Sequence, residues 1–298
     1  MMKRKREKTD ILPEVCAGKG VECMRFTKMH GIGNDYIYVN GAEESVPDPQ
    51  ELARIISDRH FGAGSDGLVI IDPISPGRFR MRMYNSDGSE GRMCGNAARC
   101  VGKYVFERGL TDCTELILDT ASGERKLKLY PEEGTVKRVL VDMGIAEFSS
   151  EKIPVLLNTG KGEPVHVDGV DSDLICVSMG NPHCVLFTDE DPEDMDIRTT
   201  GTYLEHHPVF PEGVNVEFAK VLDAQHVKMR VWERGSGETM ACGTGACAVV
   251  AAGIQSGRLS GKVQVQLLGG ILQVFMTDEG RVFQEGPAEF VYDGIWLE

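Results

Sequence analysis

The sequence predicts an α+β fold of two pseudo-symmetric domains, each a mixed or antiparallel sheet wrapped round a central helix. Three observations predict it. The second half of the chain repeats the first, short segments typical of strands outnumber helical ones, and each half has a helical segment directly after a cysteine. The 298 residues, 41% of them hydrophobic and 26% charged, suffice for one large globular domain or for two of about 150 residues each.

Charge and cysteine usage narrow the class of protein. The 46 acidic residues outnumber the 32 basic ones, and a formal net charge of −14 disfavours binding to nucleic acid or to a membrane surface. No apolar run approaches the roughly 18 residues that a membrane-spanning helix needs. Nine cysteines without a C-x-x-C pair argue against a disulfide framework and a thiolate zinc site, so we expect a protein of the reducing cytoplasm.

The internal repeat is clearest around two cysteines. MRMYNSDGSEGRMCGNAAR begins at Met81 and MRVWERGSGETMACGTGAC begins at Met229, 148 residues later, so that Cys94 falls on Cys242. At an offset of 147 residues, GNDYIYV in the first half falls on GNPHCVL in the second. Because these matches keep their order over more than 60 residues, we interpret the chain as two copies of one domain.

The repeat predicts the division of the chain into domains. The N-terminal half covers residues 24–145 and the C-terminal half covers residues 146–286. Residues 287–298 are a candidate for return to the first half, because duplicated folds often exchange end strands. Residues 1–23 contain a basic cluster but lack the apolar core of a secretory signal, and we interpret them as a disordered extension.

Local patterns predict the elements of the first half. Alternating or β-branched segments between turn residues predict strands over residues 24–30, 35–40, 68–73, 80–85, 115–120, 125–130 and 136–143. Residues 50–61 predict a helix, because Leu52, Ile55 and Ile56 form an apolar stripe. Asp48 is the expected N-cap of this helix, followed by a proline at the first helical position.

Two further helices are predicted directly after the repeated cysteines, over residues 94–109 and 242–257. The second of these segments is unusually apolar, so we expect it to be central and buried. Two domain copies usually pack about a pseudo-twofold axis. Cys94 and Cys242 should therefore lie on opposite walls of one pocket.

Each repeated cysteine has a context that suits a reactive thiol. The N-terminus of a helix presents unpaired N–H groups and a positive dipole end, and both stabilise a thiolate and lower its pKa. The glycine after each cysteine lets a carboxylate approach the backbone closely. Two thiols on either side of one carbon can remove a proton from one face and deliver a proton to the other, which is racemisation or epimerisation.

This chemistry has consequences for cofactors, and it has alternatives. No lysine motif signals a pyridoxal Schiff base, so we expect no cofactor and no metal, and the electrostatics of the site must stabilise the carbanion. Buried cysteines are often inert small hydrophobes. Two facing thiols could also form a reversible, inactivating disulfide.

Five segments resemble the diaminopimelate epimerase family: FTKMHGIGNDYIYV, DRHFGAGSDGL, YNSDGSEGRMCGNAARC, VSMGNPHCV and VWERGSGETMACGTGACA. The similarity extends from about Met24 to Glu298. It implies a pyridoxal-independent isomerase that interconverts LL- and meso-2,6-diaminopimelate, a small-molecule substrate, in lysine and peptidoglycan-precursor biosynthesis. It also implies the two-domain fold of that family and a homodimer.

The resemblance also implies roles for individual residues. Cys94 and Cys242 match the paired acid and base, and the thiol acting on the LL isomer is usually taken to be Cys94. His183 and Glu233 match positions that tune the pKa of the thiols. The substrate-binding set is Asn34, Asn85, Gly95, Asn96, Asn181, Asn215, Glu233, Arg234, Gly243 and Thr244.

The types of these residues suit a substrate with a zwitterion at each end. Arg234 can bind the distal carboxylate through two parallel hydrogen bonds, and Glu233 can pair with the distal ammonium. Gly67 departs from the family pattern, because some members carry glutamine there as a substrate contact.

Two other functions remain open. A proline or hydroxyproline racemase shares the fold and the two-thiol logic, but its substrate needs an apolar pocket without recognition of a distal charge. A catalytically inactive binding protein could also have this fold. The polar substrate-binding set argues against the racemase, and the two intact cysteines argue against the binding protein.

Overall fold

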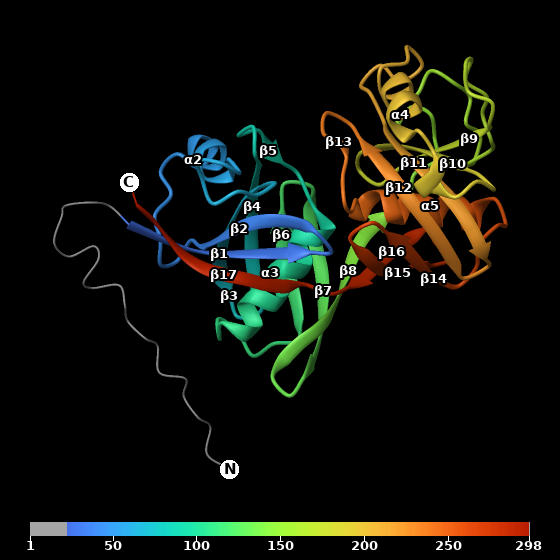
Figure 1. The fold of residues 1–298 in the computed structure, drawn as a ribbon. Helices are drawn as coiled ribbons and strands as arrows, with labels where there is room; N and C mark the ends of the chain where they lie inside the picture. The colour runs from blue at the N-terminus through green and yellow to red at the C-terminus, as the bar shows by residue number, and fades with distance from the viewer. Residues whose placement is uncertain (1–22, 298) are drawn as a thin grey trace.

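The computed structural model describes residues 23–297. The expected extension over residues 1–23 therefore lies outside the described residues, except for Cys23, which begins the first strand. Figure 1 shows two lobes that meet side by side. No helix among the described residues is long and apolar enough to cross a membrane.

The first lobe contains a sheet, the helices α2 and α3, and the last strand of the chain (Figure 1). Its elements are β1 (Cys23–Gly31), β2 (Asn34–Asn40), α2 (Pro49–Ser57), β3 (Gly67–Ser75), β4 (Arg78–Asn85), β5 (Glu90–Gly91), α3 (Gly95–Glu107), β6 (Glu115–Thr120), β7 (Gly123–Glu132), β8 (Thr135–Ile145) and β17 (Glu289–Leu297). The seven strands predicted in this half fall within β1 to β4 and β6 to β8, which confirms them.

The second lobe contains the remaining described elements (Figure 1). They are β9 (Leu174–Ser178), β10 (Pro182–Phe187), the 3₁₀-helix η1 (Pro192–Asp194), α4 (Ile197–Glu205), β11 (Asn215–Asp223), β12 (His226–Glu233), β13 (Gly237–Glu238), α5 (Gly243–Gln255), β14 (Lys262–Leu267), β15 (Gly270–Met276) and β16 (Arg281–Gly286).

The two lobes share one order of strand pairing. In the first lobe β2 pairs parallel with β3, β3 antiparallel with β4, and β4 parallel with β6. In the second lobe β10 pairs parallel with β11, β11 antiparallel with β12, and β12 parallel with β14. The repeat seen in the sequence therefore recurs as a repeat of topology.

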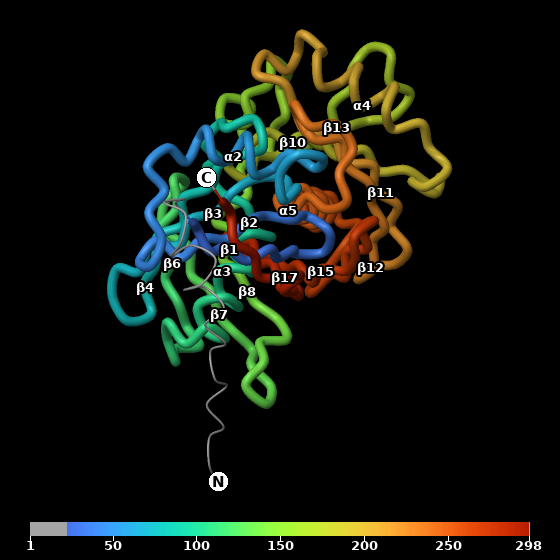
Figure 2. Tube along the Cα trace, turned by 60° about the vertical axis from the view of Figure 1, so that its left-hand side comes forward, coloured from blue at the N-terminus to red at the C-terminus, as the bar shows by residue number. Residues whose placement is uncertain are grey.

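One strand pairing joins the two lobes, and another attaches the last strand of the chain to the first lobe. β8 pairs antiparallel with β16 and so joins the sheets of the two lobes. β17 then leaves the second lobe and pairs antiparallel with β1 along most of its length, as Figures 1 and 2 show. The two lobes are thus joined by the pairing of β8 with β16 as well as by the chain itself.

Helices α3 and α5 occupy equivalent positions in the two lobes. The side chain of Cys94 caps the N-terminus of α3, and that of Cys242 caps the N-terminus of α5. Almost every residue of α5 from Gly243 to Gly253 is buried, as its apolar sequence predicts. Because both helices begin at a cysteine and run into the core, their N-termini present the thiols at the junction of the lobes.

Helix α2 begins as predicted but ends earlier. Asp48 caps it by accepting a hydrogen bond from the backbone N–H of Glu51. The helix ends at Ser57 instead of continuing to residue 61, because the Asp58 side chain accepts hydrogen bonds from the backbone N–H groups of His60 and Phe61 in a turn. The apolar stripe also differs from the expected one, since Ile55 is 46% exposed.

Candidate active site

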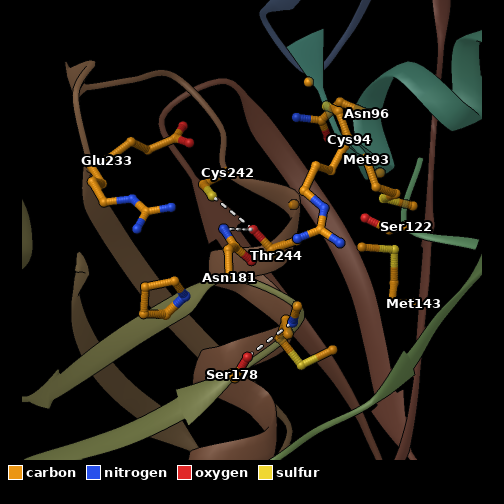
Figure 3. A pocket seen from close by; sticks show the side chains of 18 of the residues that line it. Met93, Cys94, Asn96, Ser122, Met143, Ser178, Asn181, Glu233, Cys242 and Thr244 are labelled. Atoms are coloured by element: carbon orange, nitrogen blue, oxygen red, sulfur yellow. Dashed lines mark hydrogen bonds between the residues drawn. The ribbon is translucent and has the colours of Figure 1, made fainter. Parts of the chain in front are cut away.

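One cavity of about 570 Å³ lies at the N-termini of α3 and α5 and is lined by residues of both lobes (Figure 3). Cys94 and Cys242 both line it. Eleven residues that the sequence assigned to the site line this cavity: Asn34, Asn85, Cys94, Gly95, Asn96, Asn181, Glu233, Arg234, Cys242, Gly243 and Thr244. Asn215 and His183 lie behind its wall.

The two thiols have matching local geometry. The backbone N–H of Ala97 donates to the Cys94 Sγ atom at 3.5 Å, and that of Gly245 donates to the Cys242 Sγ atom at 3.3 Å. The Cys94 thiol also donates to Asn34 Oδ1 at 3.3 Å. Each sulfur therefore receives the hydrogen bond that a helix N-terminus offers, from the residue three positions further along.

The net pKa shift of both thiols is opposite to the expected one. The pKa of Cys94 is raised to about 11, because the increase from burial, to which the nearby carboxylate of Glu233 adds, exceeds the decrease from the backbone hydrogen bonds of the helix start. Burial also raises the pKa of Cys242 well above its usual value, and the carboxylates of Glu233 and Glu217 act in the same direction. Desolvation therefore outweighs the helix termini, and both thiols of the free protein are protonated at neutral pH.

The starts of the two helices are in direct contact. The Asn96 side chain donates from Nδ2 to the backbone oxygen of Ala241 at 3.0 Å and to Asn34 Oδ1 at 3.3 Å. This amide is buried and links α3 to the residue before Cys242. The backbone N–H groups around Gly95 and Gly243 are then the donors best placed for a carboxylate in the cavity.

His183 is linked to the Cys242 thiol by a chain of hydrogen-bonded side chains. Its Nε2 atom lies 3.0 Å from Asn181 Oδ1, and its Nδ1 atom lies 2.6 Å from Glu217 Oε1. Asn181 donates to Thr244 Oγ1 at 3.3 Å, and that hydroxyl lies 3.5 Å from the Cys242 Sγ atom (Figure 3). His183 is therefore connected to the Cys242 thiol through the side chains of Asn181 and Thr244.

Glu217 is a buried residue that sequence reasoning missed. It pairs with His183, its Oε2 atom has no hydrogen-bond partner among the described residues, and burial raises its pKa. A Cβ atom on Gly245 would lie 2.8 Å from Glu217 Oε1, which places the carboxyl directly behind the cap of α5. The only signal in the sequence was its place on a strand, two residues after Asn215.

Asn215 holds the cavity wall and does not line the cavity. Its Nδ2 atom donates to the backbone oxygen of Pro182 at 2.7 Å, and its Oδ1 atom accepts from the backbone N–H of Arg234 at 3.0 Å. The Arg234 side chain in turn donates to the backbone oxygen of Glu212 at 2.7 Å. Asn215 thus holds the backbone of Arg234 in place.

Charged residues outside the assigned set also line the cavity. They are Glu90, Arg92, Arg125, Lys152 and Glu212. Arg92 and Glu90 lie within the repeated motif, so their proximity to Cys94 was readable from the sequence. Arg125 and Lys152 come from β7 and from the segment after β8, where no sequence pattern marks them.

The structure explains the departure at Gly67. This glycine lies in β3 opposite Asn85 of β4. A Cβ atom at Gly67 would lie 2.1 Å from the backbone oxygen of Tyr84 and 2.8 Å from Tyr36 Cε1. A glutamine at this position would therefore require the backbone to shift, and this chain makes no side-chain contact there.

A duplicated α+β fold with one cavity between two cysteine-capped helices is the architecture of a racemase or epimerase. The sequence profile of the family described as diaminopimelate epimerase matches residues 26–149 and 175–291. The chain belongs to this family. The fold class and the family resemblance predicted from the sequence are thereby confirmed.

Individual relatives agree with this assignment. The diaminopimelate epimerase of Acetivibrio thermocellus is 51% identical over 276 residues, which cover 91% of this chain and 98% of the relative. That of Desulfovibrio desulfuricans is 48% identical over 280 residues, with 91% and 97% covered. Among solved structures, a probable proline racemase from Agrobacterium radiobacter is similar, with a TM-score of 0.69, 15% identity, and 91% of this chain and 92% of that chain covered. At this identity, the likeness shows the fold alone.

Proposed function

We propose that this chain interconverts LL-2,6-diaminopimelate and meso-2,6-diaminopimelate at one α carbon, as a step of lysine and peptidoglycan-precursor biosynthesis. Membership of the diaminopimelate epimerase family supports the substrate. The single observation that supports the mechanism is that two cysteines, each capping a helix, line one cavity.

The proposed reaction uses the two sulfurs in opposite protonation states. The Cys94 thiolate removes the α proton of the LL isomer and becomes a thiol, while the electron pair of the broken C–H bond is delocalised onto the carboxylate. The Cys242 thiol then delivers its proton to the opposite face and becomes a thiolate. Backbone N–H groups at the two helix starts stabilise the negative charge that develops on the carboxylate. The reverse direction exchanges the roles.

The distal end of the substrate is assigned to charged residues of the cavity wall. Glu233 pairs with the distal ammonium, and Arg234 binds the distal carboxylate. The cavity is also lined by the cations Arg92, Arg125 and Lys152 and by the carboxylates Glu90 and Glu212, so its wall has charges of both signs. Such a wall can pair with a zwitterionic distal end, whereas a cyclic imino acid has no distal charge. This lining favours diaminopimelate over proline or hydroxyproline as the substrate.

The proposal includes a reducing compartment and a homodimer. In the part of the chain that the structure describes, seven cysteines, with Cys94 and Cys242 among them, are free thiols. A reducing cytoplasm keeps such thiols from oxidising. For the homodimer, light scattering is expected to give twice the chain mass of 32.7 kDa.

Hydrogen exchange in heavy water tests the proposed function. LL-Diaminopimelate incubated with the protein in heavy water should yield the meso isomer with one deuterium at the inverted α carbon, because the thiol that delivers the proton exchanges with solvent. Mass spectrometry of the separated isomers measures this. Deuterium in L-proline but not in diaminopimelate would instead support the racemase, and no exchange in either would support an inactive binding protein.

A further inference from the structure

Arg99 is a fully buried cation that forms no ion pair with a carboxylate in the described part of the chain. It lies on α3, five residues after Cys94, and its side chain is 0% exposed. Its guanidinium donates to Asn96 Oδ1 at 2.8 Å, to the backbone oxygen of Pro287 at 3.0 Å, and to Gln284 Oε1. All three acceptors are neutral, and none of the ion pairs within residues 23–297 includes Arg99. A buried charge is ordinarily paired, because the unpaired state is costly.

Gln284 connects this cation to the second helix start. Its Oε1 atom accepts from Arg99, and its Nε2 atom donates to the backbone oxygen of Gly243 at 2.8 Å. Arg99 itself holds Asn96 at the start of α3. One arginine and one glutamine therefore link the two helix N-termini that carry the cysteines, although the residues come from α3 in one lobe and β16 in the other.

Glycines make room for this pair on every side. A Cβ atom on Gly31 would lie 2.9 Å from Arg99 Nη2, and one on Gly286 would lie 3.2 Å from Arg99 Nε. A Cβ atom on Gly95 would lie 2.8 Å from Gln284 Oε1, and one on Gly243 would lie 3.0 Å from Gln284 Nε2. The backbone approaches the two side chains closely enough that their positions are tightly defined.

We propose that Arg99, oriented by Gln284, is a positioning residue that supplies an uncompensated positive charge behind the two helix starts and so stabilises negative charge on Cys94 and on the bound carboxylate. This inference rests on the proposed function for the identity of that carboxylate. The charge has a fixed place, and among residues 23–297 no carboxylate lies within ion-pair distance of it, so a substrate anion and a thiolate are the negative charges that can balance it.

The surroundings of the two thiols differ in the way this role requires. Burial raises the pKa of Cys94 and Glu233 adds to the rise, while the backbone hydrogen bonds from Ala97 and Asn96 lower it and the charge of Arg99 lowers it by a smaller amount. For Cys242, burial and the two carboxylates of Glu233 and Glu217 all raise the pKa, and the opposing groups are neutral hydrogen-bond donors. Of the two cavity thiols, Cys94 is therefore the one on which the charge of Arg99 acts.

The test measures thiol acidity in the free protein, without substrate. The rate of iodoacetamide alkylation of Cys94 is followed against pH in the Cys242→Ser background, and that of Cys242 in the Cys94→Ser background. Gln284→Glu, which sets a carboxylate against Arg99 at almost unchanged volume, should lower the alkylation rate of Cys94 at pH 8 to 9 about tenfold, which corresponds to a midpoint about one pH unit higher. Arg99→Gln should have the same effect on Cys94. Arg99→Lys keeps the positive charge and should restore most of the parent reactivity.

Controls separate this electrostatic role from a structural one. Lys103 is a buried cation on the same helix, but it is paired with Glu107, so Lys103→Gln should leave the midpoint of Cys94 unchanged. The shift at Cys242 should be less than half of that at Cys94. Folded Gln284→Glu protein with an unchanged Cys94 midpoint overturns the inference, and so does an equal shift at both thiols. Since alkylation needs no diaminopimelate, these outcomes are independent of the exchange experiment on the proposed function.

Discussion

Replacing either Cys94 or Cys242 with serine is expected to slow epimerisation by about 10³-fold, within the range that one general acid or base contributes. A serine hydroxyl has nearly the shape of the thiol but gives up its proton far less readily. The variant thus keeps the hydrogen bonds at the helix start while losing one of the two proton-transfer groups. The loss is measured as the initial rate of conversion of LL-diaminopimelate to the meso isomer.

Hydrogen exchange without inversion separates the two faces. In Cys242→Ser the remaining Cys94 can remove the α proton of the LL isomer and return a deuteron to the same face, so the LL isomer should exchange without becoming meso. In Cys94→Ser the meso isomer should exchange in this way. Cys113→Ser, which changes an exposed free thiol, serves as the control and should retain full epimerisation. A single serine variant that still epimerises at the parent rate would exclude the paired-thiol mechanism.

Repetition made the centre of the site predictable from the sequence. The matching segments around Cys94 and Cys242 implied two equivalent helix starts, and a twofold relation implied one shared cavity. The strands of the first half were predictable for a similar reason, because alternation of apolar residues is a local signal. Both kinds of inference use a pattern that recurs along the chain.

The remainder of the site has no recurring pattern. Arg99 and Gln284 are 185 residues apart in the chain and meet through side chains, and the pair occurs in no second copy. His183 and Glu217 meet across neighbouring strands and affect the cavity through Asn181. Such contacts depend on the three-dimensional packing of particular polar atoms, which neither periodicity nor composition specifies.

The direction of the thiol pKa shift could not be predicted from the sequence, for a related reason. A helix N-terminus favours the thiolate, and that contribution was evident from the order of residues. The opposing contribution comes from burial of Cys94 and Cys242 between the lobes and from the carboxylates of Glu233 and Glu217. Its magnitude depends on how much water the assembled fold removes, so the sum of the two could be obtained only from the structure.

The raised pKa of Cys94 predicts a steep pH dependence of kcat/KM for LL-diaminopimelate. With the pKa of Cys94 at about 11, the thiolate is a small fraction of the free protein at neutral pH, and that fraction grows about tenfold for each pH unit until the pH reaches the pKa. The pKa of Cys242 is also raised well above its usual value, so its thiol keeps the proton that it must deliver at neutral and mildly alkaline pH.

The measured profile should therefore rise with a slope near one from pH 7 to pH 9, because kcat/KM reports the ionisation of the free protein. Initial rates at substrate concentrations far below KM, in buffers of constant ionic strength, give this profile. Glu233 raises the pKa of both thiols, so Glu233→Gln should move the alkylation midpoint of Cys94 to lower pH even though it weakens binding of the distal ammonium. A profile that is already flat below pH 7 would contradict the resting state proposed here, in which both sulfurs are protonated and one must ionise before the α proton can leave.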